Sequence, residues 1–299
     1  MSGNSPGFST TTERRSGPYA GGRAVLATMH GKESAIAPVL LKRLGLAVST
    51  APDLDTDALG TFTGEIPRAG AMRDAAVAKA RLGMAATGLA IGIASEGSYG
   101  RHPHVPLIAG GIEIMVLVDD TRGIVVSEVL VEDTPIYDHA FAATMDELGP
   151  YFDRTGFPDQ ALIVKPFDTR IEAGAIYKGL RCKDDLAQAI TRCAAHSSEG
   201  RALVQTDMRA HMNPTRMATL SRLATAFAER LAASCPACGM PGYGQVDVET
   251  GLPCEVCGAP SIMVRNQLFG CVACSHHEMR PRPDGMTHAD RRLCPECNP

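Results

Sequence analysis

Residues 111–132 have the sequence GIEIMVLVDDTRGIVVSEVLVE, in which two runs rich in β-branched residues flank the segment Asp-Asp-Thr-Arg-Gly. Such runs joined by a short connection that contains glycine predict an antiparallel β-hairpin. Elsewhere in the chain, short apolar runs alternate with segments of helical periodicity, a pattern typical of strands joined by helices. We therefore predict an α/β fold with a mixed central sheet and flanking helices.

The elements on both sides of the hairpin follow from the same patterns. Apolar residues recur at helical spacing at Ile36, Val39, Leu40 and Leu44, and Gly45 ends this helix. Further strands are predicted at residues 23–28, 46–50, 89–95, 161–166 and 201–207. Helices are predicted at residues 32–45, 67–87, near 138–148, near 183–197 and from 214 to about 233.

Composition and patterning divide the 299-residue chain into three parts. Residues 1–22 are rich in Gly, Ser, Thr and Pro and predict a disordered tail, followed by a main domain over 23–233 and a small unit over 234–299. A hydrophobic fraction of 44% and a net charge of −4 are ordinary for a globular protein. No run approaches the ~18 apolar residues of a membrane span, and the first residues lack a signal-peptide core, so we expect a cytoplasmic protein without a membrane partner.

Eight of the ten cysteines form four Cys-x-x-Cys pairs. The pairs are Cys235/Cys238, Cys254/Cys257, Cys271/Cys274 and Cys294/Cys297. Two such pairs complete a tetrahedral shell, so the sequence predicts two structural Zn²⁺ ions in a C-terminal zinc ribbon, whereas disulfides would require an exported chain. Two pairings stay open: first with second and third with fourth, or first with fourth and second with third.

The charge of this zinc unit bears on its partners. It contains five arginines, no lysine and seven acidic residues. A surface that binds phosphate backbones normally has an excess of basic residues, so nucleic acid is disfavoured as a partner. A structural or protein-contacting module is the interpretation we favour, which leaves a nonenzymatic adaptor as one hypothesis for the whole protein.

In the main domain, polar residues follow predicted strands or begin predicted helices. Residues 27–33, ATMHGKE, place Thr28 and His30 after a strand and Lys32 at the start of a helix. A helix N-terminus that carries a lysine suits a phosphate group. A solvated lysine at a helix start would have the same sequence, so both interpretations stay open.

A second group of charges surrounds the next helix and strand. Residues 66–80, IPRAGAMRDAAVAKA, contain Arg68, Asp74 and Lys79, although an exposed helix face would look the same. Glu96 directly follows a buried strand. A carboxylate in that position is costly unless a cation or hydrogen bonds meet it.

The last helix of the main domain begins with a further cation. Asn213 can cap a helix begun by Pro214, which leaves Arg216 in its first turn. A cation at this end opposes the helix dipole. Its position is explained if Arg216 meets an anion.

The order of these segments resembles the inosine/xanthosine triphosphate pyrophosphatase superfamily over residues 23–233. The matching segments are ATMHGK (27–32), Asp74 with Lys79-Ala80, ASEGS (94–98), GFPD (156–159) and PTRMA (214–218). The zinc unit has no counterpart in the simplest members. The whole layout also resembles an uncharacterised bacterial family, which implies no function.

The resemblance implies hydrolysis of a nucleoside triphosphate, and non-canonical purine nucleotides are among the candidate substrates. It also implies that Asp74 and Glu96 hold Mg²⁺. Lys32, Lys79 and Arg216 would neutralise phosphate charge, and Glu96 would orient the attacking water. Thr28, His30 and Arg68 would complete the substrate site. The superfamily's paired acids are reduced here to Ala94-Ser95-Glu96, so nucleotide binding without turnover is the alternative.

A third hypothesis starts from the sequence GIASEGSYGRHPH at residues 92–104. His102, His104 and Glu96 could bind Zn²⁺, Mn²⁺ or Fe²⁺ and form a metallohydrolase site unrelated to nucleotides. Alternate residues of an extended segment point to opposite sides, so the two histidines would need a bend, which Pro103 could supply. Loop histidines in solvent are the simpler interpretation.

Overall fold

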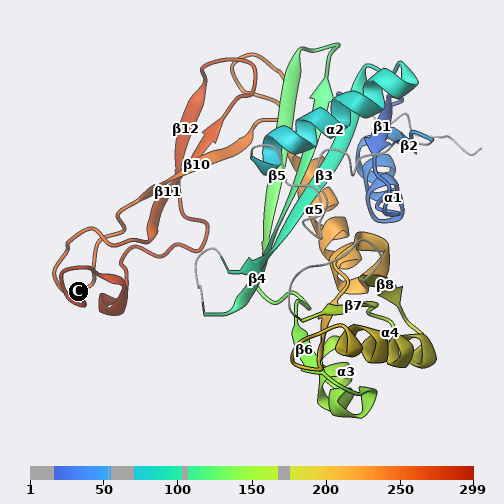
Figure 1. Ribbon diagram of the computed structural model, residues 1–299. Coiled ribbons are helices and arrows are strands. Elements are labelled where there is room, and N and C mark those ends of the chain that lie inside the picture. The colour runs from blue at the N-terminus through green and yellow to red at the C-terminus, as the bar shows by residue number, and fades with distance from the viewer. Residues whose placement is uncertain (1–16, 53, 55–70, 103–106, 168–175) are drawn as a thin grey trace, which may run out of the picture.

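The computed structural model describes residues 17–52, 54, 71–102, 107–167 and 176–299 (Figure 1). Within these residues the strands form a five-stranded, a four-stranded and a three-stranded sheet. The fold is α/β with a mixed five-stranded sheet, as predicted, and the C-terminal residues form a separate cysteine-rich unit.

The five-stranded sheet has the order β2-β1-β3-β4-β5. Its strands are β1 (Arg23–Ala27), β2 (Ala47–Thr50), β3 (Ile91–Arg101), β4 (Ala109–Asp119) and β5 (Ile124–Glu132). β1 pairs in parallel with β2 and β3, whereas β4 is antiparallel to both β3 and β5. The β4–β5 pairing, with Asp119 opposite Ile124, confirms the predicted hairpin and makes the sheet mixed.

Helices cover both faces of this sheet. α1 (Glu33–Leu44) and α5 (Pro214–Ala232) pack on one face, and α2 (Met72–Thr87) packs on the other (Figure 1). Side chains that alternate along the strands form one apolar core on each face of the sheet. Leu26 and Ile93 belong to the core under α1 and α5, and their neighbours Val25 and Ala94 belong to the core under α2. The result is a three-layer α/β/α arrangement.

The four-stranded sheet carries a third core at one end of the five-stranded sheet (Figure 1). Its strands are antiparallel in the order β6-β9-β7-β8: β6 (His139–Ala142), β9 (Ala202–Thr206), β7 (Leu162–Pro166) and β8 (Tyr177–Leu180). α3 (Gly149–Thr155) and α4 (Lys183–Ala195) accompany it. β8, α3 and the separation of these strands into their own sheet were not predicted.

The predicted helix near residues 138–148 is wrong. Residues 139–142 form β6, and only Met145–Leu148 adopt a helical turn, of the 3₁₀ type. Thr144 and Glu147 form a capping box that begins this turn at Met145. The residues before the cap are therefore left to pair with β9, which provides their backbone hydrogen bonds.

The C-terminal unit contains the antiparallel sheet β10-β11-β12. Its strands are β10 (Gly244–Thr250), β11 (Val264–Gly270) and β12 (His277–Pro281), and a 3₁₀ turn follows at Arg291–Leu293. Apart from cysteines and glycines, its buried apolar residues are Pro241, Tyr243, Leu252 and Ala289. So small a core does not stabilise a sheet, so we expect its folding to depend on the cysteines.

Most of the predicted disordered tail, residues 1–16, lies outside the described residues. Residues 17–22 differ from that prediction, because Gly17–Gly21 form a turn against the main domain and the Tyr19 ring is buried. Arg122 explains this turn: it stacks on the Tyr19 ring and donates to the carbonyl of Pro18. Among the described helices, none is both long and apolar enough to cross a membrane.

Candidate functional site

The eight paired cysteines form two clusters, and their pairing is interleaved. The first cysteine cluster consists of Cys235, Cys238, Cys271 and Cys274, and the second of Cys254, Cys257, Cys294 and Cys297. The first pair in the chain therefore joins the third, and the second joins the fourth. Neither of the two pairings left open by the sequence is the one found.

Sulfur spacing in both clusters fits a tetrahedral zinc ion. Sγ–Sγ distances are 3.8 Å for Cys235–Cys274 and 3.6 Å for Cys238–Cys271. In the second cluster, the corresponding distances are 3.9 and 3.6 Å. Four thiolates at ~2.3 Å from a central Zn²⁺ lie ~3.8 Å apart, so the two clusters could hold two zinc ions.

Backbone amides donate to one sulfur in each cluster. The amide of Val256 donates to the Sγ of Cys254 at 3.4 Å, and the amide of Ala273 donates to the Sγ of Cys271 at 3.3 Å. Amides at Cys257 and Val256 lower the pKa of Cys254 to about 7. This favours the thiolate, the form that binds metal.

A second candidate site is a buried charged cluster in the main domain. It consists of Lys32, Lys79, Glu96, Glu113 and Arg216, each less than a tenth exposed. Lys32 lies just before α1, Lys79 is on α2, Glu96 is on β3, Glu113 is on β4 and Arg216 is in the first turn of α5. Four of these five residues were predicted as site residues, and Glu113 was not.

Two ion pairs organise this charged cluster. Lys79 Nζ lies 2.6 Å from Glu96 Oε1, on the face of the sheet that α2 covers. Arg216 Nε lies 2.6 Å from Glu113 Oε1, on the face that α5 covers. Lys32 instead donates to the carbonyl oxygen and the Oγ of Ser95, at 2.7 and 3.1 Å.

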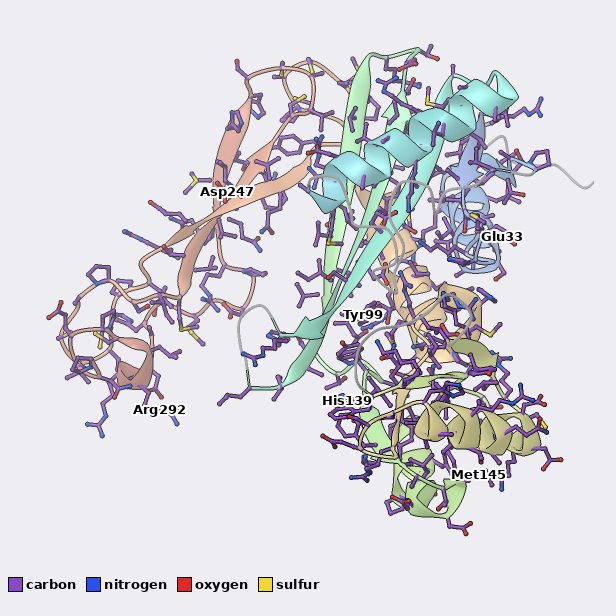
Figure 2. The ribbon with its side chains drawn as sticks, viewed as in Figure 1. Glu33, Tyr99, His139, Met145, Asp247 and Arg292 are labelled. Atoms are coloured by element: carbon purple, nitrogen blue, oxygen red, sulfur yellow. The ribbon has the colours of Figure 1, made fainter. Side chains whose placement is uncertain are left out.

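Arg216 meets an anion, as its position in the helix suggests, but this anion belongs to the protein. Asn213 caps α5 by accepting from the Arg216 amide, which confirms the predicted cap. The Tyr99 hydroxyl also donates to Glu113, at 2.8 Å, and the guanidinium of Arg216 lies over the Tyr99 ring. Figure 2 shows Tyr99 at the end of β3 nearest to the four-stranded sheet. A carboxylate inside the apolar run GIEIMVLV was the sequence signal for Glu113.

The predicted Mg²⁺ pair, Asp74 and Glu96, is not brought together as a buried site. Asp74 is exposed in the first turn of α2, whereas Lys79 is buried against Glu96. Five helical residues correspond to a rotation of about 140° around the axis, so Asp74 and Lys79 cannot both face the sheet. The carboxylate of Glu96 therefore meets an ammonium group from α2 rather than the side chain of Asp74.

The remaining predicted site residues lie in the β1–α1 connection or outside the described residues. Thr28 Oγ1 accepts a hydrogen bond from the His30 amide at 3.2 Å. The His30 ring stacks on His211, with centroids 5.2 Å apart, and this contact joins the connection to the segment before α5. Arg68 lies outside the described residues.

The histidine-metal hypothesis finds one of its two histidines in the described chain. His102 is buried, and its Nε2 lies 2.9 Å from Asp133 Oδ1. His104 lies outside the described residues. Within the described part of the chain, the two cysteine clusters are the only groups of three or more residues that could hold a metal.

Gly97 lies where the buried ion pair leaves no space for a side chain. A Cβ at this position would be 2.4 Å from Glu113 Oε1 and 2.5 Å from Arg216 Nη2. We therefore expect Gly97→Ala to lower the free energy of unfolding by about 2–3 kcal/mol, measured by urea denaturation. Gly100→Ala is the matched control on the same strand, because its Cβ would meet nothing within 4 Å. Equal stability of the two variants would contradict this packing.

Comparison with known proteins identifies one family. A family model described as a domain of unknown function, DUF6671, matches residues 79–299. No curated protein and no solved structure matches the chain. The matched region begins at Lys79 and includes Glu96, Glu113, Arg216 and all eight paired cysteines, but not Lys32. Because this match covers well over half of the 299 residues, the chain belongs to the DUF6671 family.

Proposed function

We propose that the charged cluster binds a phosphate-bearing small molecule, with nucleotides as the first candidates. The supporting observation is an imbalance of buried charge among the described residues of the cluster, where three cations, Lys32, Lys79 and Arg216, accompany two carboxylates. Lys32 forms no ion pair with any described residue, although its side chain is buried. Buried charges are costly unless they are paired, so an anionic ligand would complete the site.

The position of Lys32 supports a phosphate group in particular. It lies five residues after the end of β1 at Ala27 and is the N-cap residue of α1, which contains 12 residues. Backbone amides at a helix N-terminus carry partial positive charge and commonly bind phosphate. No side chain caps this end of α1. The amides of Ser34 and Ala35 in this first turn already donate to the carbonyls of Gly31 and Lys32, so the Lys32 ammonium group would be the main donor to a phosphate at this end.

Binding without turnover has more support than metal-dependent hydrolysis. The resemblance to nucleoside triphosphate pyrophosphatases favours a triphosphate ligand and Mg²⁺ at Glu96. In the observed arrangement, Glu96 pairs with Lys79 and Asp74 is exposed. Hydrolysis would require Lys79 to release Glu96 to a metal ion, whereas binding requires no such rearrangement. A degenerate nucleotide site is therefore the form of the hypothesis that we favour.

Calorimetry and thermal shift with pyrophosphate and a panel of standard and deaminated nucleoside triphosphates test the proposal. We expect at least one ligand to bind, and Lys32→Met to weaken it about tenfold to a hundredfold, because a charge-assisted hydrogen bond is lost. Lys42→Met, an exposed lysine at the other end of α1, is the control. Release of pyrophosphate that depends on Mg²⁺ and is abolished by Glu96→Gln would establish hydrolysis instead.

The same titration has an expected pH dependence. Burial, followed by the nearby charge of Arg216, lowers the pKa of Lys32 to about 8. The ammonium form that attracts phosphate is therefore present below pH 8 and lost above it, so affinity should fall as the pH rises through about 8. In Lys32→Met this step should disappear. Failure of every ligand to bind at pH 7, or equal binding by Lys32→Met and wild type, would refute the proposal.

Protein contact through the zinc unit is a second candidate function, and its charge arrangement favours protein over nucleic acid. Three of its five arginines pair with an acid two residues away: Arg280 with Glu278, Arg282 with Asp284 and Arg292 with Asp290. Paired arginines offer little net charge to a phosphate backbone. Around the second cysteine cluster, the apolar side chains of Val256 and Ile262 are 65% and 70% exposed. Exposed apolar groups of this kind suit a protein partner.

A further inference from the structure

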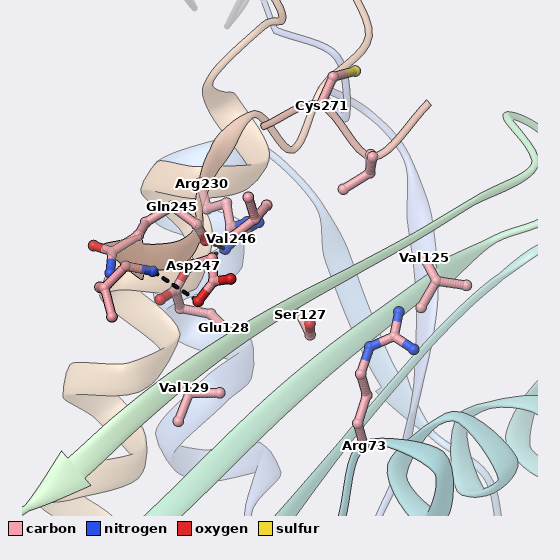
Figure 3. Close-up of a pocket in the computed structure, with 12 residues that line it drawn as sticks. Arg73, Val125, Ser127, Glu128, Val129, Arg230, Gln245, Val246, Asp247 and Cys271 are labelled. Carbon is pink, nitrogen blue, oxygen red and sulfur yellow. Dashed lines mark hydrogen bonds and ion pairs between the residues drawn. The ribbon is translucent and has the colours of Figure 1, made fainter. Parts of the chain in front are cut away.

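A groove separates the edge of the five-stranded sheet from the zinc unit. Its volume is about 690 Å³, and we call it the β5–β10 groove (Figure 3). Residues 127–129 of β5 form one wall, and residues 245–248 of β10 form the other. Arg73 of α2, Arg230 of α5 and Val125 also line it.

Both walls are edges of sheets. Among the described strands, β5 pairs only with β4, and β10 pairs only with β11. Successive side chains of a strand point to opposite faces of the sheet. Because three or four consecutive residues form each wall, the groove is lined by the backbone edge of the strand as well as by side chains. Unpaired backbone amides and carbonyls at such edges readily pair with another extended chain.

The two edges are linked by the side chain of Arg230 rather than by strand pairing. Arg230 Nη1 donates to Glu128 Oε2 of β5 at 3.3 Å and to the Gln245 carbonyl of β10 at 2.8 Å. Figure 3 draws Arg230 and Glu128 between the two walls. Gly242, just before β10, packs on Val126, where an added Cβ would be 2.6 Å from a methyl carbon. These contacts anchor the zinc unit beside β5 while the groove remains.

The side chains of the groove define the chemistry of an occupant. Val129, Val246 and Val248 are 51%, 46% and 39% exposed, so the walls carry apolar, β-branched groups. β5 has the sequence IVVSEVLVE, without the proline or lysine that commonly protects an exposed edge. Arg73 is exposed and forms no ion pair with a described residue, whereas the exposed acid Asp247 belongs to the opposite wall. An acidic side chain on the occupant would complement Arg73 on the side of the groove away from Asp247.

We propose that the β5–β10 groove binds an extended peptide of a partner protein, which adds as a strand to β5 and places an acidic residue near Arg73. Strand addition explains why the walls are unpaired edges, because main-chain hydrogen bonds supply affinity and alternate side chains supply specificity. The site is separate from the charged cluster and does not depend on the phosphate proposal.

A displayed library of random peptides of about ten residues, long enough to contain a typical strand of about five or six, tests this on the full zinc-loaded chain. We expect enrichment of sequences with alternating β-branched residues and an acid. A labelled peptide from that selection should bind about tenfold more weakly to Val129→Asp and to Arg73→Glu. Replacing the peptide's acid by lysine should restore binding to Arg73→Glu, because the charge pair is then reversed.

Val256→Asp is the matched control, since Val256 is also an exposed valine but lies at the second cysteine cluster. Zinc content and melting temperature should stay unchanged in all three variants, because the substituted side chains are exposed. Absence of enriched peptides, or equal binding by Val129→Asp and wild type, would overturn the proposal. So would a dimer of this chain that Val129→Asp dissociates, because a second copy would then occupy the groove.

Discussion

Replacing Cys271 by serine is expected to remove zinc from both cysteine clusters, although Cys271 belongs only to the first. The chain between Cys238 and Cys271 carries half of the second cluster, and the chain between Cys257 and Cys294 carries half of the first. The connecting strands β10–β12 bury few apolar side chains, so they do not hold the second cluster together once the first is lost. Zinc binding of this kind supplies roughly 10–16 kcal/mol of folding free energy.

Elemental analysis and hydrogen exchange measure the effect. Zinc content should fall from two ions per chain to well below one, and amides of β10–β12 should lose protection. Cys182→Ser is the control, because Cys182 is exposed and lies outside both clusters. Retention of one full equivalent of zinc by Cys271→Ser would mean that the clusters fold independently.

Glu113→Ala should give the second large effect, a loss of about 3–5 kcal/mol in the free energy of unfolding. Glu113 is fully buried and Arg216 is 4% exposed, so the substitution leaves a buried guanidinium without its carboxylate. The Tyr99 hydroxyl loses its acceptor as well. Urea denaturation at neutral pH measures the change.

Two further variants separate charge from packing. Glu128→Ala removes a carboxylate from the neighbouring strand, but its pair with Arg230 is partly exposed, so we expect a loss of about 1 kcal/mol or less. The double variant Glu113→Leu, Arg216→Met should recover much of the stability lost in Glu113→Ala, because it removes both buried charges. A loss near 1 kcal/mol for Glu113→Ala itself would show that Arg216 finds another partner or water.

Much of the fold is predictable because it depends on local patterns. The hairpin of β4 and β5 follows from two β-branched runs around a glycine-containing turn, and α1 and α2 end at Gly45 and Gly88, both in the left-handed conformation. The strand β6 was mistaken for a helix, because its four residues are too short to show a period and its partner β9 is distant in sequence.

The candidate site divides in a similar way. Lys32 and Arg216 were recognisable from the sequence as charges at helix starts, and Lys79 as a charge within a predicted helix. Glu96 was predicted to follow a strand that ends at Ser95, but β3 continues to Arg101 and Glu96 lies within it. The partners of these charges were not recognisable, because each ion pair joins residues from different elements: Lys79 with Glu96, and Arg216 with Glu113. Asp74 shows the limit of spacing alone, since the same helix that buries Lys79 turns Asp74 to solvent.

The sequence by itself determined the hairpin and the cysteines that form the two clusters, because these depend on residue identity and on neighbours a few positions away. Only the tertiary structure decided that the cysteine pairs interleave, that Glu113 neutralises Arg216 and that β5 and β10 leave a groove between them. Each of these depends on which segments pack together after folding, and the free energy that selects such packing comes from contacts distant in the sequence.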